Sequence, residues 1–123
     1  MRVEYYNPIN EQSGCIVRSI SRALNKNYLE VKKEISDYAR EKDYHEEEVF
    51  QSFLLEHGFT IDLSNQGSNL LELDVKGINI VLAKDNDWYH MICVIDNVIY
   101  DKNNLEDLKN LKVIKIYKST KLN

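Results

Sequence analysis

The chain has 123 residues, a length that predicts a single domain, residues 1–123, with a self-sufficient core. Hydrophobic residues make up 43% and charged residues 29%, as in ordinary globular proteins, and the net charge of −4 argues against general binding to nucleic acid or membranes. The polar N-terminus argues against a secretory signal, and no apolar run is long enough to span a bilayer. Two cysteines cannot form a disulfide framework, so we expect a cytoplasmic protein with reduced thiols.

The N-terminal half predicts an extended segment followed by three helices. Residues 1–12 form the extended lead-in, and the first helix is expected at about residues 14–25. The second helix is expected to end near residue 42, and the third follows it. Capping residues mark these helices: Asn27 with Glu30 before the second, Asp43 with Glu46 before the third, and Gly58 as the stop of the third.

After the third helix the hydrophobic period changes from 3.6 to 2, which predicts strands. They are expected at residues 59–63, 78–83, 88–95, 98–101 and 111–118. Polar loops are expected at residues 64–68 and 84–87, with one short helical turn capped by Asn69. Helices that precede a meandering antiparallel sheet predict an α+β domain.

Cys15 lies at the first turn of the first predicted helix, beside the apolar stripe that includes Ile16 and Ile20. Ser13 is the expected N-cap and Gly14 permits a tight turn, so Cys15 falls where backbone N–H groups lack partners within the helix. These donors and the positive end of the helix dipole stabilise a thiolate. The same pattern also fits a small, half-buried and inert cysteine.

The hairpin around Asp96-Asn97 brings a histidine and a carboxylate together. A two-residue turn there places Ile92 opposite Asp101 and His90 opposite Asn103. His90 and Asp101 are then diagonal neighbours on one face, about 7 Å apart between backbones. A carboxylate in this position can orient an imidazole as the base for a nucleophile, and Asn103 is the competing partner. Alternatively, His90 is a polar residue at the end of a strand, and Asp101 is a solvated carboxylate or a turn former.

A metal site does not fit these residues. His90 and Cys93 are separated by an odd number of positions on one strand, so their side chains point to opposite faces. His45 and His57 have no ligand-like spacing. We therefore expect no metal and no cofactor. Cys93 is expected to be buried, protonated and inert, because burial disfavours a thiolate.

Two segments resemble the papain-like cysteine peptidase superfamily. Gly14-Cys15-Ile16-Val17-Arg18-Ser19-Ile20 is similar to its Asp-Cys-x-x-Arg-Ala-Ile motif, and residues 90–101 are similar to its His-(apolar strand)-Asp-Gly-x-Ile-Tyr-Asp motif. Small papain-fold proteins of bacteria and phages, and bacteriocin-leader peptidases, carry such motifs. The resemblance implies a papain-like fold with the cysteine helix packed on a C-terminal antiparallel sheet. It also implies that Cys15 is the nucleophile, His90 the general base and acid, and Asp101 the orienting residue.

The chain departs from this family pattern at three positions. Gly14 replaces the acid that usually precedes the cysteine, and Asn97 replaces the glycine of the hairpin turn. The oxyanion-hole glutamine of papain-like enzymes lies six residues before the cysteine, where this chain has Ile9. Three nearby amides are candidates for this donor, with Asn10 expected first: Asn10, Asn7 and Gln12.

The expected function is a cysteine-dependent hydrolase that cleaves a peptide or isopeptide bond through an acyl-enzyme. Acyl transfer and glutamine deamidation use the same triad, and a catalytically inactive papain-fold protein that binds a host partner is the alternative class. Arg18 and Arg22 are candidates for binding a substrate carboxylate or phosphate, or else form salt bridges with nearby acids. Trp88 either walls the cleft or belongs to the core. A protein or peptide is the expected partner; the oligomeric state does not follow.

Overall fold

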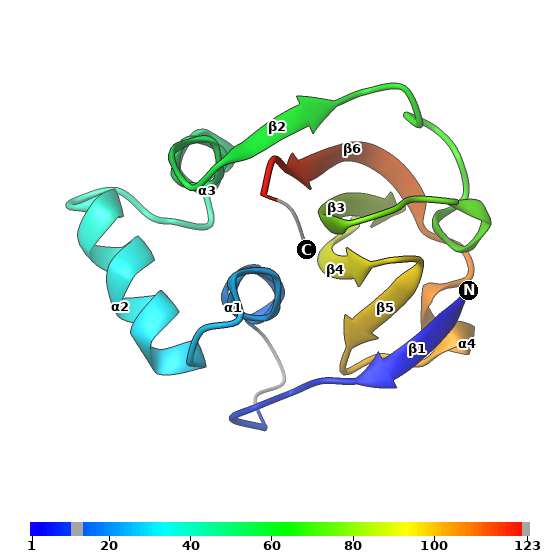
Figure 1. Cartoon of the computed structure of the whole chain (residues 1–123), viewed down its shortest axis with the longest axis horizontal. Coiled ribbons are helices and arrows are strands. Elements are labelled where there is room, and N and C mark those ends of the chain that lie inside the picture. The colour runs from blue at the N-terminus through cyan, green and yellow to red at the C-terminus, as the bar shows by residue number, and fades with distance from the viewer. Residues whose placement is uncertain (11–13, 122–123) are drawn as a thin grey trace.

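The computed structural model describes residues 1–10 and 14–121 and has an α+β architecture built on one mixed sheet (Figure 1). Within these residues the strands are β1 (Arg2–Tyr5), β2 (Phe59–Asp62), β3 (Ile78–Asp85), β4 (Trp88–Ile95), β5 (Val98–Asp101) and β6 (Lys112–Ser119). Their order across the sheet is β1-β5-β4-β3-β6-β2. The long β3–β4 hairpin therefore lies at the centre, as expected for the most apolar strands.

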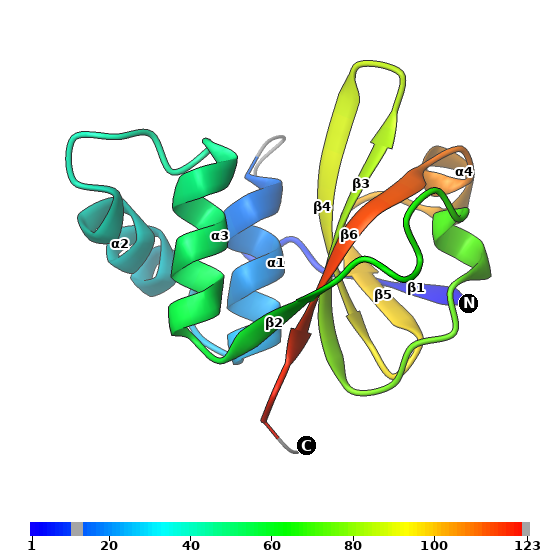
Figure 2. The same ribbon diagram turned by 90° about the horizontal axis from the view of Figure 1, so that it is seen from above.

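Helices cover both faces of this sheet. The described residues form α1 (Cys15–Leu24), α2 (Tyr28–Ala39), α3 (Glu47–Glu56), the short α4 (Leu105–Leu108) and a 3₁₀ turn, η1 (Leu70–Glu72). Figure 2 shows α1, α2 and α3 together on one side of the sheet and α4 on the other. No helix in this part of the chain has the length and apolarity needed to cross a bilayer.

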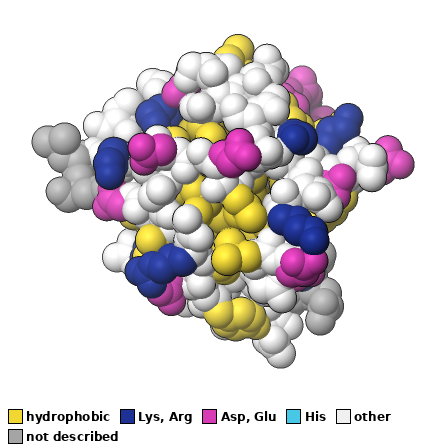
Figure 3. Space-filling view, turned by 90° about the vertical axis from the view of Figure 1, so that its right-hand side faces the viewer, with side chains coloured by type: hydrophobic (Ala, Val, Ile, Leu, Met, Phe, Trp, Pro, Cys, Tyr) yellow, Lys and Arg dark blue, Asp and Glu magenta, His cyan; other side chains and the backbone are white. Residues whose placement is uncertain are grey.

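Two hydrophobic clusters hold the layers together, one on each side of the sheet. Alternation along β3 divides its side chains between them, with Ile80 and Leu82 in the cluster under α1–α3 and Val81 and Ala83 in the opposite cluster. All four side chains are buried. On the side away from α1–α3, apolar side chains also reach the surface among charged ones (Figure 3).

The first strand corrects the expectation of a purely antiparallel sheet. Residues 2–5, expected only as an extended lead-in, form β1, which pairs in parallel with β5, and the pairing matches Tyr5 with Asp101. The next residue continues the contact, because the Tyr6 N–H donates to the Asp101 carbonyl at 2.9 Å. A parallel pair joins segments that are distant in sequence, so the local hydrophobic pattern could not indicate it.

The β4–β5 hairpin has the predicted register. Asp96 and Asn97 adopt positive φ angles of 46° and 67°, as a two-residue type I′ turn requires. Ile95 pairs with Val98, and the pairing continues to Cys93 with Tyr100. The prediction from the turn is confirmed, which fixes the face on which each later side chain projects.

Several helix ends differ from the predictions. Helix α2 is capped by Asn27 as expected, but it ends at Ala39 rather than near residue 42, because Arg40 adopts a positive φ of 57°. Helix α3 begins at Glu47, and its N-cap, Glu46, makes no side-chain capping bond. The expected cap, Asp43, instead accepts the N–H of His45.

The end of one strand and one short helix were also missed. Strand β3 continues to Asp85, so the turn that was expected at residues 84–87 is limited to Asn86 and Asp87. Helix α4 was not predicted, although Asn104 and Asp107 form a capping box at its start. It spans a single turn, which is too short for a periodic pattern.

Candidate active site

Cys15 is the first residue of α1, and the backbone before it has an unusual conformation. The N-cap is Gly14, with φ 96° and ψ 26°, a conformation that side-chain-bearing residues rarely adopt. Its carbonyl accepts the N–H of Arg18 at 2.9 Å, which starts the helix. The prediction of Ser13 as the N-cap is therefore wrong by one position, and Ser13 itself lies outside the described residues. The first N–H groups of α1 have no helical acceptors, so the thiol lies at the positive end of the helix dipole.

The sheet leaves a place for this helix end beside β4. The β4–β5 pairing stops at Cys93 and Tyr100, whereas β4 begins earlier, at Trp88. Beyond the last pair the backbone of β4 therefore has a free edge on this side. The Met91 N–H on that stretch forms a hydrogen bond with the Cys15 sulfur. The half-buried thiol is thus held between the helix N-terminus and the strand.

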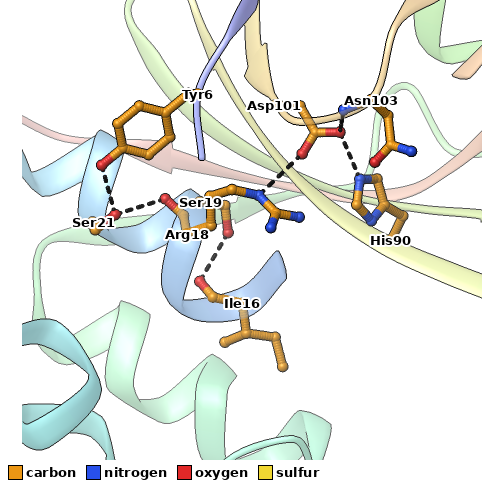
Figure 4. A network of polar contacts seen from close by, with 8 residues as sticks. All are labelled: Tyr6, Ile16, Arg18, Ser19, Ser21, His90, Asp101 and Asn103. Carbon is orange, nitrogen blue, oxygen red and sulfur yellow. Dashed lines mark hydrogen bonds and ion pairs between the residues drawn. The ribbon is translucent and has the colours of Figure 1, made fainter. Parts of the chain in front are cut away.

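His90 and Asp101 are in direct contact, as the hairpin register predicted. His90 Nε2 and Asp101 Oδ2 are 2.8 Å apart, and the two side chains are only 4% and 1% exposed. The same Oδ2 accepts the Asn103 N–H at 3.2 Å, so Asn103 supports the carboxylate instead of replacing it (Figure 4). The Trp88 ring stacks on the imidazole, with centroids 4.8 Å apart. With Nε2 engaged, Nδ1 is left for the hydrogen bond with Cys15.

This arrangement favours a thiolate–imidazolium pair. Burial alone would raise the pKa of the Cys15 thiol, but the hydrogen bond and positive charge of His90 outweigh it, with help from the Met91 N–H and Arg18, and the pKa is lowered. Burial likewise opposes the charged form of His90, but Asp101 and Cys15 together raise its pKa to about 9. A thiolate beside an imidazolium is the reactive state of a cysteine nucleophile.

Both arginines that were candidates for substrate binding contact other residues of the protein. Arg18 is only 1% exposed, and its Nε lies 3.4 Å from Asp101 Oδ1. Arg18 therefore pairs with a member of the candidate triad, which is the second of its two expected roles, a salt bridge with a nearby acid. Arg22 lies over the Tyr100 ring, 4.1 Å from its centroid, which makes it a packing residue.

Two pockets share Cys15 and His90 in their linings. The more polar one, about 290 Å³, is lined by Gly14, Cys15, Arg18, His45, Trp88, Tyr89, His90, Lys102 and Asn103. The more apolar one, about 330 Å³, is lined by Cys15, Ile16, His45, Glu47, Phe50, Leu82, Tyr89, His90 and Met91. Together they form a cleft with the thiol at its centre. Trp88 lines this cleft, which is one of the two roles expected for it.

The two expected oxyanion-hole amides that the structure describes, Asn7 and Asn10, do not line this cleft. Asn10 is exposed, and its N–H donates to the Asn7 carbonyl at 3.1 Å. Gln12 lies outside the described residues. The backbone N–H of Cys15, at the start of α1, is a donor that the helix supplies without any side chain.

The second cysteine differs from Cys15 in its burial and in the pKa of its thiol. Cys93 is fully buried in the cluster beneath α1, and burial raises the pKa of its thiol to about 12. It is therefore protonated at neutral pH, as the sequence predicted.

The described residues hold no group of three or more His, Cys, Asp or Glu side chains arranged to bind a metal ion.

Some residues of the cleft were not identified from the sequence. Tyr89 and His45 line both pockets, and Lys102 lines the polar one. Tyr89 precedes His90 and Lys102 follows Asp101, so adjacency to the proposed triad was an available signal. His45 carried no such signal, because the loop between α2 and α3 brings it there.

No family model, curated protein or solved structure was found to match this chain.

Proposed function

We propose that this chain is a cysteine-dependent hydrolase with a papain-like fold, which cleaves a peptide or isopeptide bond. The observation that carries the proposal is the convergence of three side chains from separate elements. The Cys15 thiol lies at the N-terminus of α1, hydrogen-bonded to His90 of β4, whose other nitrogen is bonded to Asp101 of β5. The order of these elements along the chain also matches the papain-like motifs.

In the first half of the reaction, the Cys15 thiolate attacks the acyl carbon of the substrate. The carbonyl oxygen gains negative charge, which the N–H groups at the start of α1 can stabilise. The carbon–nitrogen bond then breaks, and His90 gives its Nδ1 proton to the departing amine. The products are a free amine, a thioester on Cys15 and a neutral imidazole.

In the second half, the neutral imidazole acts as a general base. His90 takes a proton from water, and the resulting hydroxide attacks the thioester carbon. The carbon–sulfur bond breaks, which releases the acid and restores the thiolate–imidazolium pair. Asp101 holds the ring through Nε2 in both halves of the reaction. Acyl transfer or glutamine deamidation would follow the same steps, with another acceptor or another amide.

The cleft supports a peptide-like substrate with an apolar side chain next to the cleaved bond. Ile16, Phe50, Leu82 and Met91 supply the apolar wall of one pocket, and all four are buried. The other pocket offers Lys102 and the Asn103 amide, which suit polar or anionic groups. An apolar side chain can therefore occupy one pocket while polar groups of the same chain lie in the other.

A binding protein with an inactive triad is the second candidate. It is favoured by the position of Asn7 and Asn10, which among the described residues do not line the cleft where an amide donor is needed. In this case the same cleft would hold a partner without cleaving it.

The experiment is labelling with a peptide vinyl sulfone, followed by mass mapping and by an assay on a mixture of peptides and isopeptides. A cysteine hydrolase is expected to label at Cys15, to lose labelling in His90→Ala, and to release new amines from the mixture. A folded protein that is not labelled at Cys15 would refute the proposal and favour the binding protein.

A further inference from the structure

Asp101 is held by two cations, one on each carboxylate oxygen. Oδ2 contacts His90 at 2.8 Å, and Oδ1 lies 3.4 Å from Arg18 Nε (Figure 4). Arg18 follows Cys15 by three positions on α1, so both side chains lie on the same part of the helix, about one turn apart. The contacts therefore run from Cys15 through His90 and Asp101 to Arg18 and return to Cys15 through the helix.

Three of these four side chains are charged and buried. Within residues 1–10 and 14–121, Arg18, His90 and Asp101 are the only charged side chains that are fully buried. With a Cys15 thiolate, an imidazolium, a carboxylate and a guanidinium, two negative and two positive charges cancel. Without the guanidinium, the same state would carry one uncompensated negative charge, which is costly to bury.

We propose that Arg18 is a positioning residue that fixes Asp101 and balances its charge, so that the Cys15–His90 pair holds its proton on the imidazole. The inference rests on the proposed function, in which these groups act as one unit. Without Arg18, the neutral arrangement is a protonated Cys15 beside an imidazolium–carboxylate pair. The nucleophile would then exist as a thiol at pH values at which the native protein has a thiolate.

Other charged and titratable groups face the site but are more exposed to solvent. On the pocket side these are His45 from the α2–α3 loop, Glu47 from α3, Tyr89 from β4 and Lys102 after β5. His45 pairs with Asp43, and Glu47 pairs with Lys115. On the α1 side, Arg22 lies over Tyr100. The charged residues of β1, Arg2 and Glu4, form an exposed ion pair with each other. Solvent screens such groups far more than it screens Arg18.

The test measures the rate of iodoacetamide alkylation of Cys15 as a function of pH, with mass mapping to separate it from Cys93. Arg18→Met is expected to move the midpoint of this profile upward by about one pH unit or more, the usual effect of a nearby buried charge. Arg18→Lys keeps a positive charge, so its midpoint is expected to lie close to that of the native protein. Arg22→Met is the matched control on the same helix, and its midpoint is expected to stay at the native value.

A second variant keeps the proposal testable if Arg18→Met does not fold. Arg18→Met combined with Asp101→Asn removes one charge of each sign, so its midpoint should return toward the native value. A folded Arg18→Met protein with an unshifted midpoint would refute the role of Arg18, as would a double variant whose midpoint stays raised. If the native protein itself shows an ordinary thiol midpoint, it is the proposed nucleophile that fails.

Discussion

Replacing Cys15 by serine should change how the stability of the protein depends on pH. In the folded protein His90 has a raised pKa of about 9, so its contribution to stability is complete below its unfolded pKa, about 6.5, and is lost as the pH rises through 9. Cys15 has a lowered pKa, so its contribution is present above the unfolded thiol pKa and is lost as the pH falls through the folded value. The two contributions therefore oppose each other.

Consider the pH values above 6.5 at which the folded Cys15 is already a thiolate and the unfolded thiol, with its pKa of about 8.5, is still protonated. There the folded and unfolded forms of the native protein bind the same number of protons through this pair. The unfolded chain carries the proton on the thiol, and the folded chain carries it on the imidazole. The free energy of unfolding should therefore be nearly independent of pH as far as this pair is concerned. In Cys15→Ser only the folded His90 keeps a proton, so stability should fall by about 1.4 kcal/mol per pH unit.

In Cys15→Ser the free energy of unfolding should fall by about 1–2 kcal/mol between pH 7 and 8.5. The fall is smaller than the full slope would give, because losing the thiolate also lowers the folded pKa of His90 and so narrows the pH range over which only the folded state holds the proton. Urea unfolding followed by circular dichroism at several pH values measures it. The rest of the chain is identical in the two proteins, so the difference between the two curves isolates the Cys15–His90 pair. Parallel curves for the native protein and Cys15→Ser would refute the ion pair.

Three further predictions concern the cleft. Limiting iodoacetamide near pH 6.5 should alkylate Cys15 and spare the buried Cys93, and His90→Ala should slow the reaction; equal labelling of both thiols by mass mapping would contradict this. Tyr89→Ala should raise KM with little change in kcat, and should change the free energy of unfolding by less than about 0.5 kcal/mol, because the ring is 57% exposed; an unchanged KM would remove Tyr89 from the substrate site. Asn10→Ala should leave kcat within about twofold, since loss of a true oxyanion donor costs about 10²–10³; a loss of that size would restore the role expected from the sequence.

The parts of the site that could be predicted are local in sequence. The contact between His90 and Asp101 followed from one turn, because Asp96 and Asn97 fix a register that carries through the next pairs of residues. The start of α1 followed from hydrophobic period and glycine chemistry in the same way. In each case the information lay within about a dozen residues.

The parts that were missed depend on packing between distant segments. Arg18 was a candidate either for binding substrate or for a salt bridge with a nearby acid. No pattern near it indicated that Asp101, on the last strand of the hairpin, would lie against it. The parallel pairing of β1 with β5 is of the same kind. The free edge of β4 at Met91 also follows from where two strands stop pairing, which is a property of the assembled sheet.

The energetics of this network favour a chemical role over a structural one. Burying an ion pair costs desolvation that mutual attraction offsets only in part, and an apolar packing of similar volume is often as stable or more so. In the described part of this chain, buried charge is confined to Arg18, His90 and Asp101, next to the half-buried thiol, while the rest of both clusters is apolar. A fold that needed only stability could have filled this space with apolar side chains, as it does elsewhere. The charged side chains are buried beside the cleft, at positions where they can exchange a proton with the thiol. Functional sites are where proteins commonly retain buried charges despite the cost of desolvation.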